Sequence, residues 1–495
     1  MSSSFPILTA EEAIRDIHHG DTVAFSGFTP AGAAKAVPRA LAARARAAAL
    51  QGAPFKLRVL TGASSGQAID EELAAAGAIM WRAPYQTGSA LRKQINAGDV
   101  EYVDMHLSHV PQTVGFGFFG PIDVAVVEAT EVTPDGRVYL STSIGASPTY
   151  LSCARKVIVE VNRSQSPRLR EIADIFIMPP PPHRNAIPVF HPLTRIGWPY
   201  AMVDPQKVVA VVETDEADQV APFADADEDS RRIAAHVVEF LLSEMKAGRI
   251  PGEFLPLQAG VGNVANAVLS ALGEHPDIPP FYMYSEVFQN SMADLMLAGK
   301  LKGASATSLT ITADKLQHLV EHMDHFNRCL VLRPQEISNH PGVIRRLGVM
   351  GMNTAVEVDI YGNVNSSHLL GMDVINGIGG SGEFTRNSYL SVFMTPSIGK
   401  GGRISKVVPM CPHVDNNEHS VQIIVTEQGL ADLRGLGPMQ RADVIIEKCA
   451  HPLYRDYLRR YVREARPGHI RHDLLRCFEL HRNLMEHGTM LPGQV

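Results

Sequence analysis

Short apolar runs rich in valine and isoleucine recur along the whole chain, and segments with helical periodicity separate them. The runs lie at 21–27, 56–64, 122–130, 156–162, 207–214, 254–260, 281–286, 329–333 and 421–427. Helical patterns occupy, for example, 38–50 and 230–248. Continuous apolar strands that alternate with helices predict an α/β fold with buried, largely parallel sheets. Ligands bind to such sheets beyond the carboxyl ends of the strands.

The chain of 495 residues is longer than one hydrophobic core usually organises, so two domains are expected. An acidic stretch of small residues, 213–230, follows the predicted strand at 207–214. We place the domain boundary there, which gives an N-terminal α/β domain at 1–225 and a C-terminal α/β domain at 226–495. A strand, a glycine turn and a helix follow one another near the start of each, although the similarity is too low to establish a repeat.

Composition excludes some classes of partner. The formal net charge of −7 argues against nucleic acid, which normally meets a basic face. The N-terminus lacks the pattern of a secretory signal, and we find no run of about 20 apolar residues that could cross a membrane. Five scattered cysteines without a CxxC pair are typical of reduced thiols. We therefore expect a cytoplasmic protein without a membrane partner.

The strongest local motif is GVGNVANAV at 260–268, between a predicted strand and a predicted helix. Gly260 and Gly262 allow a tight turn, after which the first amides of the helix can face a phosphate. A glycine turn without any ligand is the plain alternative. The motif also approximates a dinucleotide-binding fingerprint, with Glu286 placed as the ribose-binding acid. A nicotinamide-dependent dehydrogenase is thus an open alternative.

A second glycine cluster, NGIGGSGEF at 376–384, can bring backbone N–H groups to a ligand or to a developing oxyanion. A flexible surface loop is the alternative interpretation. Lys400 follows between glycines and can meet a phosphate or a carboxylate, though most lone lysines are simply solvated.

Acidic residues end several predicted strands, and spacing alone does not select among them. They are Glu128, Glu160, Glu213, Glu286 and Glu427. A βαβ connection would place the strand of Glu286 beside the strand that leads into the 260–268 loop, which favours Glu286 among these acids.

The string His318-Leu-Val-Glu321-His322, within a predicted helix at 312–326, matches a zinc-protease pattern. Such short matches are frequent in a chain with 20 histidines, so no metal site is predicted.

Longer strings resemble a known family. They are SGFTPAGAAKAVPRAL, LTGASSG, RAPYQT and INAGDVEYVDMHLS in the N-terminal half, and QAGVGNVANAV, YSEV, ISNHPGVIRRLGVMGMNTAVEVDIYGNVNS, NGIGGSGEFTRNSYLS and VTEQGLADLRG in the C-terminal half. Together and in this order, they are similar to class I CoA-transferases of the acetyl-CoA hydrolase/transferase family, in the succinyl-CoA:acetate CoA-transferase branch. The resemblance covers nearly the whole chain.

The resemblance implies two related open α/β domains with the active site at their interface. It implies Glu286 as the nucleophile, with Asn339 and the backbone amide of Gly380 stabilising the oxyanion. The implied contacts to coenzyme A are Gly260, Val261, Gly262, Asn263, Val264, Asn376, Gly380 and Lys400.

The implied activity is transfer of CoA between succinyl-CoA, or another short acyl-CoA such as propionyl-CoA, and acetate. Coenzyme A would be a substrate, no permanently bound cofactor is expected, and a homodimer is implied. Acetyl-CoA hydrolysis is the alternative within the family. A CoA-binding module without catalysis is a third alternative, in which Glu286 and Asn339 would have no task.

Overall fold

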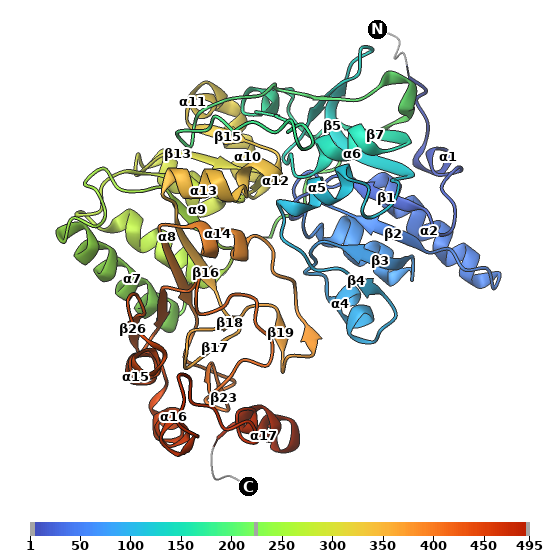
Figure 1. The fold of residues 1–495 in the computed structure, drawn as a ribbon. Coiled ribbons are helices and arrows are strands. Elements are labelled where there is room, and N and C mark those ends of the chain that lie inside the picture. The colour runs from blue at the N-terminus through green and yellow to red at the C-terminus, as the bar shows by residue number, and fades with distance from the viewer. Residues whose placement is uncertain (1–4, 222–225, 492–495) are drawn as a thin grey trace.

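The computed structural model describes residues 5–221 and 226–491, which form two large, mainly parallel β-sheets (Figure 1). The first sheet has nine strands in the order β4-β3-β2-β1-β5-β6-β8, and β7 pairs with β5 and β9. Strand β6 runs antiparallel to β5 and β8, and the other pairings are parallel. The strands are β1 (Thr22–Phe25), β2 (Leu57–Leu60), β3 (Ile79–Ala83), β4 (Glu101–Tyr102), β5 (Val124–Val132), β6 (Arg137–Leu140), β7 (Lys156–Asn162), β8 (Ala201–Met202) and β9 (Val208–Thr214).

The second sheet has eight strands in the order β15-β13-β11-β10-β16-β21-β25-β26. Its pairings are parallel except that between β25 and β26. The strands are β10 (Leu257–Ala259), β11 (Phe281–Tyr284), β13 (Leu301–Ala306), β15 (Leu330–Leu332), β16 (Met350–Thr354), β21 (Leu390–Met394), β25 (Ile423–Thr426) and β26 (Gly429–Asp432). This confirms the expected α/β class with largely parallel sheets.

Short strands form four small sheets beside the second one. They are β12 (Val287–Gln289) with β14 (Ser308–Thr310), β17 (Glu357–Asp359) with β18 (Val364–Asn365) and β24 (Val407–Val408), β19 (His368–Leu369) with β20 (Asp373–Val374), and β22 (Ile398–Gly399) with β23 (Ile404–Ser405).

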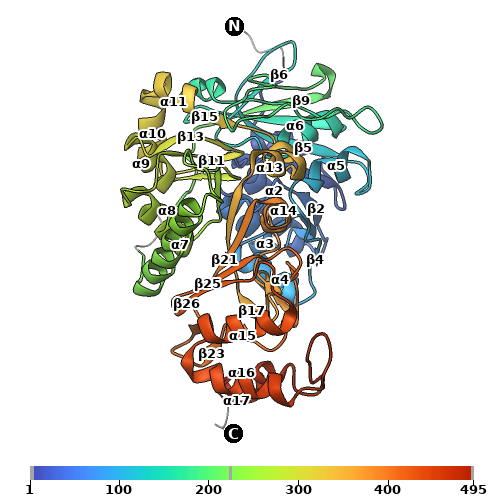
Figure 2. The same cartoon turned by 60° about the vertical axis from the view of Figure 1, so that its left-hand side comes forward.

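Helices follow most of the strands, and Figure 2 shows α15, α16 and α17 gathered at the end of the molecule near the C-terminus. The α-helices are α1 (Ala10–Ala13), α2 (Ala36–Leu50), α3 (Glu72–Ala75), α4 (Ser89–Asn96), α5 (His109–Gly115), α6 (Ser147–Cys153), α7 (Glu228–Lys246), α8 (Asn263–Glu274), α9 (Asn290–Leu297), α10 (Ala313–Glu321), α11 (Met323–Cys329), α12 (Gln335–Ser338), α13 (Pro341–Leu347), α14 (Ser381–Asn387), α15 (Pro438–Lys448), α16 (Pro452–Glu464) and α17 (Glu479–His487).

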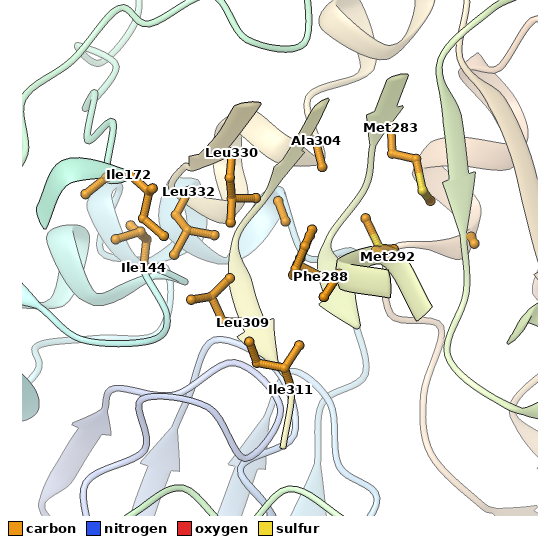
Figure 3. Close-up of a cluster of buried hydrophobic side chains, with 14 of the residues drawn as sticks. Ile144, Ile172, Met283, Phe288, Met292, Ala304, Leu309, Ile311, Leu330 and Leu332 are labelled. Carbon is orange, nitrogen blue, oxygen red and sulfur yellow. The ribbon is translucent and has the colours of Figure 1, made fainter. Parts of the chain in front are cut away.

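One hydrophobic cluster joins the two sheets. Ile144 and Ile172 of the N-terminal half lie near Leu309 and Leu332 of the C-terminal half, and Phe288 belongs to the same cluster (Figure 3). Burying apolar side chains from both halves in one core favours their association. The segment that carries Glu286 therefore lies against a continuous core.

The segment 164–200 also belongs to this junction. Ala173 bridges to Leu332, and the side chains of Asp174 and Arg333 form a buried ion pair. The N-terminal half thus reaches onto the edge strand of the second sheet. The predicted division between residues 225 and 226 stays a prediction, because residue 225 lies outside the described residues.

All nine predicted apolar strands are present, and so are the helices predicted at 38–50 and 230–248. The single helix predicted at 312–326 is wrong, because α10 ends at Glu321 and α11 begins at Met323. His322, between them, has φ −107° and ψ 28°, outside the helical region.

Candidate active site

Glu286 follows strand β11 at its carboxyl end, as the sequence predicts. Its backbone carbonyl accepts hydrogen bonds from the N–H groups of Thr307 (2.7 Å) and Ser308 (3.3 Å), which fixes the chain at this point. The half-buried side chain lines a pocket of about 170 Å³. Desolvation raises the pKa of Glu286 to about 7, and the hydrogen bond from Asn339 partly opposes this rise.

Asn339 is fully buried at the C-terminal end of α12. Its side-chain nitrogen Nδ2 donates to Oε1 of Glu286 and, at 2.8 Å, to Oε2 of Glu383. Its oxygen Oδ1 accepts from the hydroxyl of Ser338 at 2.9 Å. The amide therefore presents N–H groups to the carboxylate of Glu286.

Gly380 lies directly against this carboxylate, at the start of α14. A Cβ atom at this position would lie 1.5 Å from Oε1 of Glu286 and 2.4 Å from Nδ2 of Asn339. No side chain can occupy that space without moving the glutamate. Glycine is required here by close approach, since its φ of −93° is accessible to any residue.

The glycine segment 376–380 is held by the N-terminal half of the chain. The N–H group of Ile378 donates to both carboxylate oxygens of Asp104 (2.9 Å each), and the hydroxyl of Tyr102 donates to the carbonyl of Asn376 (2.7 Å). Desolvation raises the pKa of Asp104 to about 6, partly opposed by the Ile378 N–H. The interpretation of this segment as a flexible surface loop is therefore wrong.

The pocket lies between the two halves. Residues of the N-terminal half line one side, namely Phe28, Thr29, Ala63, Ser64, Tyr85 and Leu107. Gly260, Val261, Glu286, Asn376 and Gly380 line the other side. Burial and the nearby Glu286 raise the pKa of Tyr85 above its usual value, so its hydroxyl stays neutral.

Comparison with known proteins decides the family. Two family models match this chain: the acetyl-CoA hydrolase/transferase N-terminal domain over residues 5–213, and the acetyl-CoA hydrolase/transferase C-terminal domain over residues 316–462. The chain belongs to the acetyl-CoA hydrolase/transferase family. The expected CoA-transferase family is thereby confirmed.

Three relatives in this family span nearly the whole chain. The propanoyl-CoA:succinate CoA transferase of Escherichia coli is 56% identical, with 99% of this chain and 100% of the relative aligned. The succinyl-CoA:acetate CoA-transferase of Clostridium kluyveri is 44% identical, covering 98% and 90%. The acetyl-CoA hydrolase of Schizosaccharomyces pombe is 41% identical, covering 95% and 93%.

Solved structures support the fold. RipA from Yersinia pestis matches with a TM-score of 0.71 at 24% identity, covering 92% of this chain and 96% of that one. The 4-hydroxybutyrate CoA-transferase from Porphyromonas gingivalis matches with a TM-score of 0.62 at 21% identity, covering 92% and 97%.

The glycine loop predicted to contact CoA adjoins the Glu286 pocket. Gly260 and Val261 line the pocket, and Nε2 of Gln289 donates to the carbonyl of Gly260 at 3.2 Å. Gly262, with φ of +133°, immediately precedes α8. Asn263 and Val264 begin that helix, so their N–H groups belong to its unpaired first turn.

Lys400 does not line the Glu286 pocket, unlike several of the other residues predicted to contact CoA. It is exposed in the turn between β22 and β23, with φ of +48°. It lines a second cavity of about 340 Å³, together with Val356, Leu369 and His481. The structure thus brings Glu286, Asn339, Gly380, Asn376 and the 260–261 turn together, and leaves Lys400 at a different cavity.

Sequence reasoning did not single out Glu383 or Tyr85. Glu383 is buried in the first turn of α14 and contacts Asn339, and desolvation raises its pKa to about 8. Both residues occur inside strings that resemble the family, GIGGSGEF and RAPYQT. Only that resemblance could have drawn attention to them. An acidic residue in the first turn of a helix, such as Glu383, is common because its charge is favourable at the helix N-terminus, so its position alone does not indicate a function.

The other four strand-end acids have partners outside the pocket. Glu213 forms an ion pair with Arg163 at 2.7 Å. Glu128 forms a buried ion pair with Lys35. Glu160 accepts hydrogen bonds from N–H groups at the start of α2. Glu427 accepts from the N–H of Ser397 at 2.7 Å. Of the five acids, Glu286 alone lines the pocket between the halves.

His318, Glu321 and His322 form the one cluster among the described residues whose side chains could hold a metal ion, and their ligand atoms lie within 4.8 Å of one another. It is a largely exposed cluster at the end of α10, and none of the three residues lines the Glu286 pocket.

Within residues 5–221 and 226–491, no helix is long and apolar enough to span a membrane.

Proposed function

We propose that this protein transfers CoA between succinyl-CoA and a short acid, acetate or propionate, with Glu286 as the covalent nucleophile. One observation carries the proposal: the Glu286 carboxylate lines a pocket between the two halves of the chain, accepts a hydrogen bond from buried Asn339 and contacts Gly380. Two relatives named above transfer CoA to or from succinate, which supports this choice of acid.

The carboxylate of Glu286 attacks the thioester carbonyl, the C–S bond breaks, and CoA leaves as the thiolate. The product is an anhydride between the acyl group and Glu286. The thiolate then attacks the glutamyl carbonyl and expels the first acid as its carboxylate, leaving CoA on Glu286 as a thioester. A second acid reverses both steps, so the kinetics are ping-pong.

Each step passes through a tetrahedral oxyanion. Nδ2 of Asn339 and the N–H group of Gly380 are the proposed donors to it, and each such donor contributes about 3 kcal/mol to the transition state. The partly desolvated carboxylate of Glu286 is more basic than an exposed one, which increases its reactivity once it is ionised.

The turn at Gly260 and Val261 and the start of α8 are proposed to bind the CoA portion, because backbone N–H groups and the helix dipole favour phosphate there. Asn376 and Lys400 are proposed as further CoA contacts by resemblance. Binding energy from this distant part of the substrate can be used in the transition state.

Acetyl-CoA hydrolysis is the second candidate, since relatives in fungi carry that name. Transfer requires an acceptor acid and conserves the thioester, whereas hydrolysis releases free thiol without an acceptor. The dehydrogenase alternative is dropped, because the matching family models describe acyl-CoA chemistry.

A cytoplasmic location, a homodimer and the absence of a permanently bound cofactor remain part of the proposal. The five free cysteines are compatible with a reducing compartment.

The test incubates the protein with succinyl-CoA and measures its intact mass after acid quenching. We expect an added mass of CoA less one water, lost when acetate is supplied. Glu286→Ala should give no adduct, while the control Glu336→Gln, at a buried glutamate outside the pocket, should behave as wild type. A wild-type protein that turns over acyl-CoA without ever carrying CoA contradicts the proposal.

A further inference from the structure

Glu383 connects three segments of the chain beside the nucleophile. It lies in the first turn of α14 and is 4% exposed. Its Oε1 accepts the N–H of Ser108 at 2.7 Å, from the N-terminal half, and its Oε2 accepts Nδ2 of Asn339 at 2.8 Å. Burying a carboxylate costs free energy, so we expect Glu383 to have a functional role that compensates for this cost.

The two hydrogens of the Asn339 amide nitrogen have different recipients. One is donated to Oε1 of Glu286 and the other to Oε2 of Glu383, while Oδ1 accepts from Ser338. An amide turned by 180° would present its oxygen to both carboxylates and its nitrogen to a hydroxyl. An ionised Glu383 can only accept hydrogen bonds, so it penalises the turned orientation and holds the N–H groups toward the nucleophile. Because desolvation raises the pKa of Glu383 to about 8, this effect is complete only above that pH.

We propose that Glu383 is a positioning residue of the transfer reaction, which fixes the Asn339 amide so that its N–H faces Glu286 and the oxyanion formed there. This inference rests on the proposed function, because it assigns Glu383 a task in that reaction. The hydrogen bond from Ser108 also ties Glu383 to the N-terminal half, which lines one side of the pocket.

Glu383→Gln is the informative variant, since it keeps size and shape. A glutamine presents one oxygen and one NH₂ group to two donors, so either Ser108 or Asn339 loses its acceptor. We expect kcat to fall about 100-fold with KM for succinyl-CoA changed less than about twofold, the range seen when one oxyanion donor is lost. Glu336→Gln, one turn before Asn339, is the control and should stay within about twofold of wild type.

A double-mutant cycle separates positioning from a general structural effect. If Glu383 acts through Asn339, adding Glu383→Gln to Asn339→Ala should lower the rate of CoA–enzyme formation by less than about twofold further. Losses that multiply, or a Glu383→Gln variant with wild-type kcat, would overturn the inference. If the Glu383→Gln variant does not fold, Glu383→Asp replaces it, because the shorter carboxylate cannot reach Ser108 and Asn339 together. The effect of Glu383→Asp on the rate must then also be smaller in the Asn339→Ala protein than in wild type.

The failure of this inference can be told apart from failure of the proposed function. If wild-type protein forms the CoA adduct and Asn339→Ala slows it, but Glu383→Gln does not, only the role of Glu383 is wrong. If wild-type protein forms no adduct, the covalent mechanism is wrong, and the task proposed for Glu383 is wrong with it.

Discussion

The side-chain amide of Asn339 donates a hydrogen bond to Oε1 of Glu286 from a fully buried position. Two segments 53 residues apart thus meet at the atom proposed to attack the thioester. Replacing Asn339 with alanine should lower kcat by about 10²- to 10³-fold, because the oxyanion loses a donor. Single-turnover adduct formation measures this directly. An unchanged rate in a folded Asn339→Ala protein would contradict the role of the amide.

A methyl group at Gly380 should disable the site through geometry. The added Cβ would lie 1.5 Å from Oε1 of Glu286, so the carboxylate must move out of its hydrogen bond. A displacement of about 1 Å can cost a factor of 100 or more in rate. We expect Gly380→Ala to lose at least 100-fold in kcat/KM. Gly252→Ala, where a Cβ meets nothing within 4 Å, is the matched control and should keep wild-type activity.

The rate should rise with pH through neutrality. Only ionised Glu286 can attack, and desolvation raises its pKa from 4.5 to about 7. Protonated Glu286 therefore dominates below that pKa, and kcat/KM for succinyl-CoA should increase about tenfold per pH unit at low pH. The rate should level off only above about pH 8, because Glu383, whose pKa is raised to about 8, must also be ionised to accept both of its hydrogen bonds. Initial rates across this range test it. A profile that is flat from about pH 5 to pH 8 would contradict the assignment.

The buried ion pair between Asp174 and Arg333 should stabilise the junction of the two halves. Both side chains are at most 1% exposed, and Arg333 also donates to the hydroxyl of Ser305 (2.8 Å) and to the carbonyl of Pro192 (3.0 Å). Asp174→Ala leaves an unpaired buried cation and should lower the free energy of unfolding by about 3–5 kcal/mol. Urea denaturation measures the loss. Asp174→Ala combined with Arg333→Met should be less destabilised than Asp174→Ala alone.

Lys400 should affect CoA binding without affecting the chemical step. If its ammonium group meets a phosphate of CoA, Lys400→Ala should raise KM for succinyl-CoA about tenfold, equivalent to about 1.4 kcal/mol, with little change in kcat. The effect should vanish with succinyl-pantetheine, which lacks those phosphates. Lys302→Ala, at an exposed lysine of β13, is the control. Equal effects on both substrates would show that Lys400 does not contact the phosphates.

Apolar runs predicted nine strands of the two large sheets, namely β1, β2, β5, β7, β9, β10, β11, β15 and β25. Strands β13 and β16 were not predicted, because LKGASA and MGMNT contain small and polar residues that local patterns assign to loops. These positions are strands because neighbouring strands pair with them on both sides. Pairing between distant segments is information that a local window lacks.

The residues of the candidate site could likewise be predicted only in part. Resemblance named Glu286, Asn339 and Gly380, and the geometry brings them into contact. It did not identify Glu383, whose partners Ser108 and Asn339 lie 275 and 44 residues away in sequence. The sequence leaves such a carboxylate indistinguishable from a surface acid at a helix start, and only the packing of three segments reveals its contacts.

The most direct measurement is peptide mapping of the enzyme quenched during turnover with succinyl-CoA. The account predicts CoA attached as a thioester within the peptide that contains Glu286, present without acetate and discharged when acetate is added. CoA attached to a different residue, or rapid transfer with that peptide unmodified throughout, would contradict it.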